Sequence, residues 1–232
     1  MSQLLDIVKN KLLVETFYVP SLKTEIKGKT LTINQYNKIL ELSMLEPVDR
    51  MSNYMLLTDE IIQENIESTD NLSYFDKVFL LLQMKIAQSN EYYGVNSEIY
   101  KETLRSRCED LDITQFDKEY NHNGIKILLG ISSFNQGVEL NNTVYNKSDS
   151  FDVKSILICE ILRSIKKIEF EDTDLDTKEL KPIDLINSIP ASLIEFNKGY
   201  QHEINLFITN ANKFVYNEQE FSLYPSIDVM LL

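Results

Sequence analysis

Residues 74–89 read YFDKVFLLLQMKIAQS, which is the best-supported structural element in the sequence. Ser73 and Asp76, three residues apart, form a start signal for a helix that we expect to run from Tyr74 to Ser89. The helix carries Phe75, Val78, Phe79, Leu80, Leu81, Leu82, Met84 and Ile86. A helix that is apolar on nearly all sides is buried, so we predict that it lies at the centre of the protein.

Helical patterns also precede this segment. Ser2 to Val14 reads as a short amphipathic helix, and Thr32 with Gln35 forms a capping box that predicts a helix start near Ile33. Pro47 marks the end of that helix, and a second helix is expected from Val48 to Asn65. The predicted apolar faces comprise Ile33, Tyr36, Ile39, Leu40 and Met44 in the first, and Met51, Tyr54, Met55, Ile61 and Ile62 in the second.

Strand patterns occupy three places. Phe17–Val19 and Glu25–Lys27 read as a short strand pair around Pro20. The glycine-interrupted middle, Tyr92–Asn146, predicts several short strands, with polar turns at residues 121–124 and 139–142. Periodicity leaves Ile99–Arg107 open between strand and helix. Residues 214–216 and 221–224 indicate a small hairpin.

The last third returns to helical spacing. Val153 to about Lys167 is predicted to be one helix, followed by an acidic connector at Glu169–Asp176 and a short helix at Thr177–Ser188. Pro190 suits the first position of a helix that reaches about Asn210.

These patterns predict a mostly helical α+β fold, with an N-terminal strand pair, a small β-rich middle segment and a C-terminal hairpin. We divide it into residues 1–92, residues 93–148 and residues 149–232.

Charge restricts the partners. The 232 residues hold 36 Asp and Glu against 23 Lys and Arg, a net charge of -13. Such a surface repels phosphate backbones and anionic lipids, which favours a protein partner over nucleic acid or membrane. The first residues lack the features of a signal peptide, and Val78–Met84 is too short to span a bilayer, so we expect a cytoplasmic protein.

The sequence contains no recognisable catalytic, metal-binding or cofactor-binding motif. Cys108 and Cys159 are expected to be buried reduced thiols, and His122 and His202 to be surface residues. Residues 172–176 (DTDLD) imitate the start of a calcium loop, but Thr177 and Ile183 replace the required glycine and glutamate. We therefore expect no catalytic residue, no metal site and no cofactor.

Both ends of the chain are unusually apolar. They pack intramolecularly, the commoner case, or they form an exposed patch typical of a protein interface. The partner-binding candidates are Leu4, Leu5, Val8, Leu12, Ile227, Val229, Met230, Leu231 and Leu232.

Three segments carry a family resemblance. They are Val19–Lys27 (VPSLKTEIK) leading to Tyr36–Leu40 (YNKIL), Leu72–Lys85 (LSYFDKVFLLLQMK), and Asp176–Leu180 (DTKEL) leading to Leu185–Pro190 (LINSIP). Their order resembles that in the baseplate hub assembly proteins of T-even-like contractile-tailed bacteriophages. The glycine-rich middle resembles this family poorly. Residues 28–31 (GKTL) also replace its usual arginine and Pro-Phe pair, and the Cys-x-x-Cys pairs of some relatives are missing.

The resemblance implies a non-enzymatic role in tail assembly, in the host cytoplasm or the virion baseplate, with other tail or baseplate proteins as partners. Self-association stays open. The alternatives are a chaperone of the tail tape-measure protein, an enzyme with unrecognised acidic catalytic residues, and a host interaction module unrelated to phage.

Overall fold

The computed structural model describes residues 14–89, 94–145, 153–170, 190–216 and 218–223. Seven helices and three small antiparallel sheets make up this part of the chain, which confirms the α+β class. The helices are α2 (Ile33–Leu42), α3 (Pro47–Asn65), α4 (Asp76–Ser89), α5 (Ser97–Arg107), α6 (Phe134–Tyr145), α7 (Val153–Ser164) and α8 (Ala191–Ala211), with a 3-10 turn, η1 (Ile113–Phe116). The strands are β1 (Val14–Val19), β2 (Thr24–Lys29), β3 (Lys118–His122), β4 (Ile125–Leu129), β5 (Ile165–Phe170), β6 (Lys213–Tyr216) and β7 (Gln219–Ser222).

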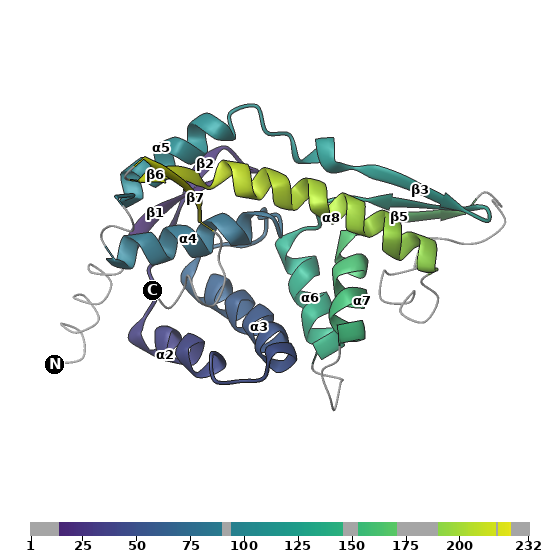
Figure 1. Ribbon diagram of the computed structural model, residues 1–232, viewed down its shortest axis with the longest axis horizontal. Coiled ribbons are helices and arrows are strands. Elements are labelled where there is room, and N and C mark those ends of the chain that lie inside the picture. Colours follow the sequence, from purple (N-terminus) through teal and green to yellow (C-terminus); the bar gives the residue numbers. More distant parts are fainter. Residues whose placement is uncertain (1–13, 90–93, 146–152, 171–189, 217, 224–232) are drawn as a thin grey trace.

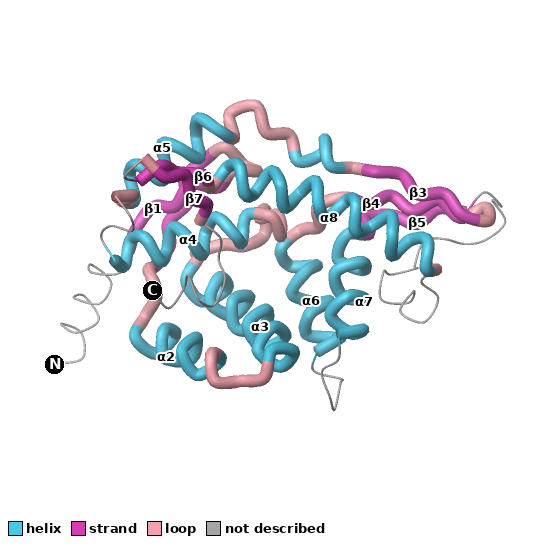
Figure 2. The backbone as a smooth tube through the Cα atoms, in the orientation of Figure 1, coloured by secondary structure: helices cyan, strands magenta, loops and turns pink. Residues whose placement is uncertain are grey.

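The molecule is elongated, with a sheet region at each end (Figure 1). Strands β1, β2, β6 and β7 lie at one end, and the sheet β3-β4-β5 lies at the other. Helix α8 runs between the two ends, while α3, α6 and α7 lie below it in this view (Figure 2). Within the described residues, no helix is both long and apolar enough to cross a membrane.

Helix α4 is the common wall of two hydrophobic clusters. Phe79, Leu82 and Ile86 belong to the larger cluster, which also takes side chains from α5 to α8 and from the three-stranded sheet. Leu80 and Leu81 belong to the smaller one, with side chains from β1, α2 and α3. The central position predicted for this segment is confirmed, although the helix begins at Asp76 rather than Tyr74.

Polar residues of α4 hold the N-terminal hairpin. The Gln83 amide donates to the Tyr18 carbonyl (2.8 Å) and accepts from the Tyr18 amide (2.7 Å), as a neighbouring strand would. The Asp76 carboxylate accepts hydrogen bonds from the amide and hydroxyl of Ser21 and from those of Ser73. Burial raises the pKa of Asp76, and these four hydrogen bonds oppose that shift. The helix start predicted from Ser73 and Asp76 is confirmed. Asp76 also connects this helix start to the β1-β2 hairpin.

Helix α2 begins as predicted, but much of the face that the sequence predicts to be buried is exposed. Thr32 and Gln35 make the capping box, and Gln35 exchanges amide hydrogen bonds with Asn65 of α3. This buries Gln35 and Ile39, so the predicted inward face is wrong for three residues: Ile33, Leu40 and Met44 are exposed. A polar pair decides the helix orientation because a buried amide must be hydrogen-bonded.

Other boundaries also need correction. Pro47 does not end α2 but is the first residue of α3, in which Met51 is 45% exposed. Residues 139–142, predicted as a turn, lie inside α6, and Ile99–Arg107 belongs to a helix, so the middle segment is less β-rich than predicted. Pro190 is the N-cap of α8, one residue before the helix.

The predicted hairpin turn near Gly124 is confirmed. Asn123 and Gly124 both have positive φ angles (48° and 76°), the backbone of a tight two-residue turn between β3 and β4. Beyond it, the helix expected to run to Lys167 stops at Ser164, and β5 pairs with β4. The backbone of residues 165–170 is thus hydrogen-bonded to β4 and not within a helix, a long-range pairing that helical periodicity does not reveal.

Cys108 and Cys159 are free and buried, as predicted. Burial raises the pKa of the Cys108 thiol to about 11 and also raises that of Cys159.

We predict that replacing Asp76 with alanine lowers the free energy of unfolding by about 2–4 kcal/mol, because two backbone amides and two hydroxyls lose their acceptor. Urea denaturation followed by circular dichroism measures the change. Asp110→Ala, at an exposed carboxylate, is the control and should stay within about 0.5 kcal/mol of the parent protein. If the two variants were equally stable, the hydrogen bonds of Asp76 would not be stabilising the fold.

We also predict that neither thiol of the folded protein reacts readily with a disulfide reagent near pH 8. The thiolate is the reactive form, and a pKa of about 11 leaves only about one Cys108 in a thousand ionised at that pH. Both thiols should react at once in 6 M guanidinium chloride. Rapid labelling of the native protein, followed by absorbance, would show that this part of the core is open.

Candidate binding site

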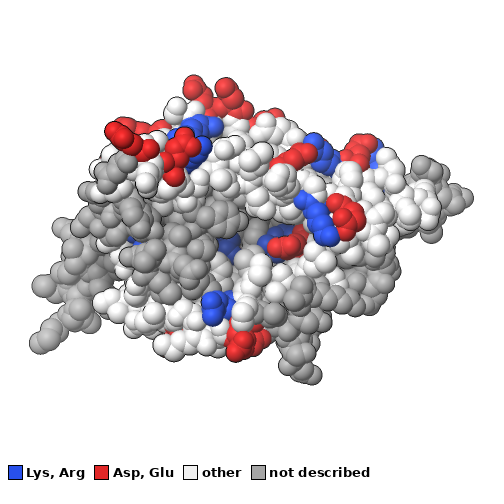
Figure 3. Space-filling view, in the orientation of Figure 1, with Lys and Arg blue, Asp and Glu red and all other residues white. Residues whose placement is uncertain are grey.

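A cavity of about 540 Å³ opens between α3, α4, α7 and α8. Its remaining wall is the segment Gly130–Ser132, which follows β4. The space-filling view shows a hollow near the centre of one face, with basic and acidic atoms in its floor (Figure 3). We call this space the central cavity.

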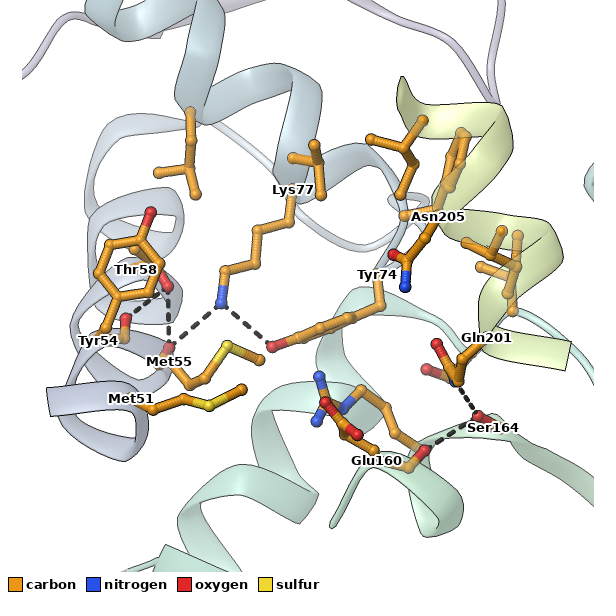
Figure 4. A pocket seen from close by; sticks show the side chains of 18 of the residues that line it. Met51, Tyr54, Met55, Thr58, Tyr74, Lys77, Glu160, Ser164, Gln201 and Asn205 are labelled. Atoms are coloured by element: carbon orange, nitrogen blue, oxygen red, sulfur yellow. Dashed lines mark hydrogen bonds between the residues drawn. The ribbon is translucent and has the colours of Figure 1, made fainter. Parts of the chain in front are cut away.

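A buried ion pair forms part of the polar wall of the central cavity. The Lys77 ammonium lies 2.6 Å from Asp59 Oδ1, and both side chains are almost fully buried. Lys77 also donates to the Met55 carbonyl (3.2 Å) and to the Tyr74 hydroxyl (3.1 Å), as Figure 4 shows. Lys77 follows the first residue of α4, and Asp59 lies within α3, so the pair joins the two helices.

Helix α6 completes this network. The Asn141 amide donates to Asp59 Oδ2 (2.5 Å) and to the Tyr74 hydroxyl (2.9 Å), and Cys159 Sγ donates to Asn141 Oδ1 (3.1 Å). Gly137 brings α6 close, because a Cβ atom there would lie 2.1 Å from the Tyr74 ring. The ring position is therefore determined by a glycine.

Helix α7 supplies an arginine whose donors are not all used. The Arg163 guanidinium lies over the Tyr74 ring, 4.6 Å from its centroid. Its Nε and Nη2 atoms are buried without a hydrogen-bond partner in the described structure, as are Ser132 Oγ and Tyr200 OH. All three residues line the central cavity. Buried polar atoms normally have partners, so this grouping indicates a site for a polar group of a ligand.

Glu160 is the one carboxylate among the described lining residues. Burial raises its pKa, and the nearby Arg163 acts in the opposite direction. Glycoside hydrolysis needs a pair of carboxylates, and this lining supplies a single one. Within the described residues, no three His, Cys, Asp or Glu side chains are grouped so that they could hold a metal ion.

Much of the remaining lining is apolar. Helices α3, α4 and α8 contribute Met51, Tyr54, Met55, Val78, Leu81, Ile204 and Ile208. Figure 4 shows Met51, Met55 and Tyr54 on one side, and Glu160, Ser164 and Gln201 on the other. A largely apolar concavity with a few polar groups is the usual form of a ligand-binding pocket.

A second candidate feature lies on the outer face of α2. Ile33 is 79% exposed, Met44 is 80% exposed and Leu40 is 42% exposed. Ile33 and Leu40, seven residues apart, lie on one side of α2, opposite Gln35 and Ile39, and Met44 lies in the turn two residues beyond the end of the helix. We call these three residues the α2 stripe.

All nine sequence-predicted partner-binding residues, from Leu4 to Leu12 and from Ile227 to Leu232, lie outside the described residues. The calcium-like loop at residues 172–176 does as well. His122 and His202 are exposed, at the end of β3 and on α8 respectively, as expected.

The sequence interpretation missed the central cavity and the network at Lys77. A signal was present, because Asp76 and Lys77 are charged residues at the start of an otherwise apolar segment. Ionisable side chains in a buried helix need an oppositely charged or hydrogen-bonding partner, and the charged residues of neighbouring helices are the candidates for that partner.

Comparisons with known proteins give no further guidance. Neither the protein-family models, nor the curated proteins, nor the solved structures contain a match to this chain.

We predict that Lys77→Met lowers the free energy of unfolding by about 3–5 kcal/mol, because Asp59 then stays buried without its counter-ion. The double variant Asp59→Leu/Lys77→Met should be more stable than Lys77→Met alone, since it removes both charges. Urea denaturation of the parent protein and both variants measures these differences. A double variant no more stable than Lys77→Met would show that the two ions are not coupled.

Proposed function

We propose that this protein is a non-enzymatic component or assembly factor of a phage tail baseplate hub, acting by binding another tail protein. The observation that supports this proposal most directly is the α2 stripe. It places two large apolar side chains on the outside of α2 and a third in the turn that follows, while the buried face of the helix already packs against α3.

Burial of such side chains supplies binding energy. Covering a fully exposed Ile or Met side chain contributes about 1.5–3 kcal/mol each. Ile33 and Met44 leave most of their surface in water, so a partner that covers both gains a substantial part of a typical binding free energy. Helix faces with this spacing of apolar side chains commonly dock into a groove of the partner.

Charge selects the partner. Glu41, Glu46 and Asp49 are exposed around the α2 stripe, whereas Lys38 is paired with Glu60. Together with the net charge of -13, this acidic rim favours a less acidic protein. A second copy of the same chain carries the same charge and is disfavoured.

The assignment to phage tails comes from the sequence resemblance. One of its three segments, Leu72–Lys85, covers the greater part of α4, and another covers the β1-β2 hairpin region and leads into α2.

A photo-crosslinking residue at position 44 tests the proposal in infected cells. We expect it to crosslink to a tail or baseplate protein, identified by mass spectrometry, because Met44 is the most exposed residue of the α2 stripe. In purified protein, Ile33→Glu/Met44→Glu should weaken binding to that protein by roughly 30-fold or more. The stability of this variant should stay within about 0.5 kcal/mol of the parent, as for a surface change.

Ile99→Glu is the matched control, because Ile99 is 43% exposed but lies on α5. It should leave binding unchanged. Crosslinks at position 44 only to host proteins, or equal effects of both variants, would refute the proposal. Mass spectrometry of purified tails then separates a component, which is present in them, from an assembly factor, which is absent.

A further inference from the structure

We propose that the central cavity binds an apolar molecule that ends in a carboxylate, with the size of a medium-chain fatty acid. In this arrangement Arg163 receives the carboxylate, and the apolar chain extends along α3 and α4. The inference is independent of the proposed function, because none of the three residues of the α2 stripe lines this cavity.

The unused donors of Arg163 are the first argument. A guanidinium presents its N–H groups in a planar fork that matches the two oxygens of a carboxylate. Nε and Nη2 lie on one edge of this fork, and both lack an acceptor in the described structure. The Tyr74 ring holds the guanidinium by its face, at 4.6 Å, which leaves the edge for a ligand.

Two further hydroxyls belong to the same wall. Ser132 Oγ and Tyr200 OH are also buried without a partner within the described ranges, and both residues line the central cavity. Burial raises the pKa of Tyr200 well above its usual value, so its hydroxyl keeps the proton and can donate. Both hydroxyls are therefore further candidate contacts for the polar group of a ligand.

The distribution of the lining residues is the second argument. Glu160, Arg163 and Ser164 come from α7, and Ser132 comes from the segment before α6. Figure 4 shows Met51 and Met55 of α3 on the side away from Glu160 and Ser164, and Val78 and Leu81 of α4 also line the cavity. A ligand with one polar end and a flexible apolar body matches this division, and methionine side chains adapt readily to such a body.

The local charges favour an anion despite the acidic surface. Asp59 neutralises Lys77 at 2.6 Å, so these two charges cancel. Arg50 also lines the cavity, and its guanidinium donates to the Leu45 carbonyl. Glu160 is the opposing charge, and its carboxylate should repel the ligand.

The volume is suitable. The central cavity measures about 540 Å³, within the range of roughly 300–1,000 Å³ typical of small-molecule pockets.

Figure 4 shows Asn205 of α8 facing Tyr74 and Lys77 across this space. Asn205 is exposed, so a substitution there changes the charge of the cavity without disturbing the core.

Calorimetric titration with decanoate and with decanol tests the proposal, because the two share a chain and differ in the polar end. The parent protein should bind decanoate more tightly than decanol. Arg163→Met should weaken decanoate binding roughly 10- to 100-fold, the effect of a lost charge-assisted hydrogen bond, and should leave decanol binding nearly unchanged. Glu160→Gln should strengthen decanoate binding, since it removes the repelling charge.

Asn205→Asp provides a second test should Arg163→Met fail to fold, because its added negative charge should weaken decanoate but not decanol. Arg105→Met, at a surface arginine paired with Glu25, is the matched control and should change neither affinity. A dipeptide, acetyl-Leu-Leu, presents the same chemistry from a polypeptide end, so its binding in place of decanoate would identify a peptide as the source. No binding of either carboxylate, or equal binding of decanoate and decanol in every variant, overturns the proposal.

Discussion

Helix α4 is buried on nearly every side, so the polar groups that it carries need partners inside the protein. Asp76 bonds to Ser21, Gln83 to the backbone of Tyr18, and Lys77 to Asp59. A buried polar group without a partner costs about 1–3 kcal/mol, so each of these side chains positions its neighbour as well as its own helix. The β1-β2 hairpin and α3 are therefore placed relative to α4 by hydrogen bonds as much as by apolar contact.

The same constraint forms the site. Lys77 is neutralised by Asp59, and Asn141 extends the network to α6, while Tyr74 stacks beneath the Arg163 guanidinium. Arg163 differs from the residues of α4, because its Nε and Nη2 atoms lack a partner within the described ranges. A buried, incompletely satisfied polar group costs stability, and such groups concentrate at functional sites. The central cavity and the α2 stripe are thus separate features, one a concave site with unused donors and the other a convex apolar face.

Part of this structure could be predicted from local patterns. The Thr32–Gln35 capping box, the Ser73–Asp76 start signal and the turn at Asn123-Gly124 were all predicted, since each depends on residues within a few positions of one another. The boundary between α7 and β5 was missed because β5 forms by pairing with β4, about forty residues earlier in the chain. The α2 stripe was predicted to face inward, because periodicity identifies an apolar face but not the direction in which it points.

The sequence by itself determined the fold class, the central helix, the acidic surface and the buried state of both cysteines. These properties follow from composition, periodicity and capping, which are local. Only the tertiary structure decided that Gln35 rather than Ile33 faces α3, and that Lys77 meets Asp59. It also decided that Arg163, Ser132 and Tyr200 line one cavity. These outcomes depend on which segments distant in the chain pack together, because a polar side chain acquires its partner only when the helices meet.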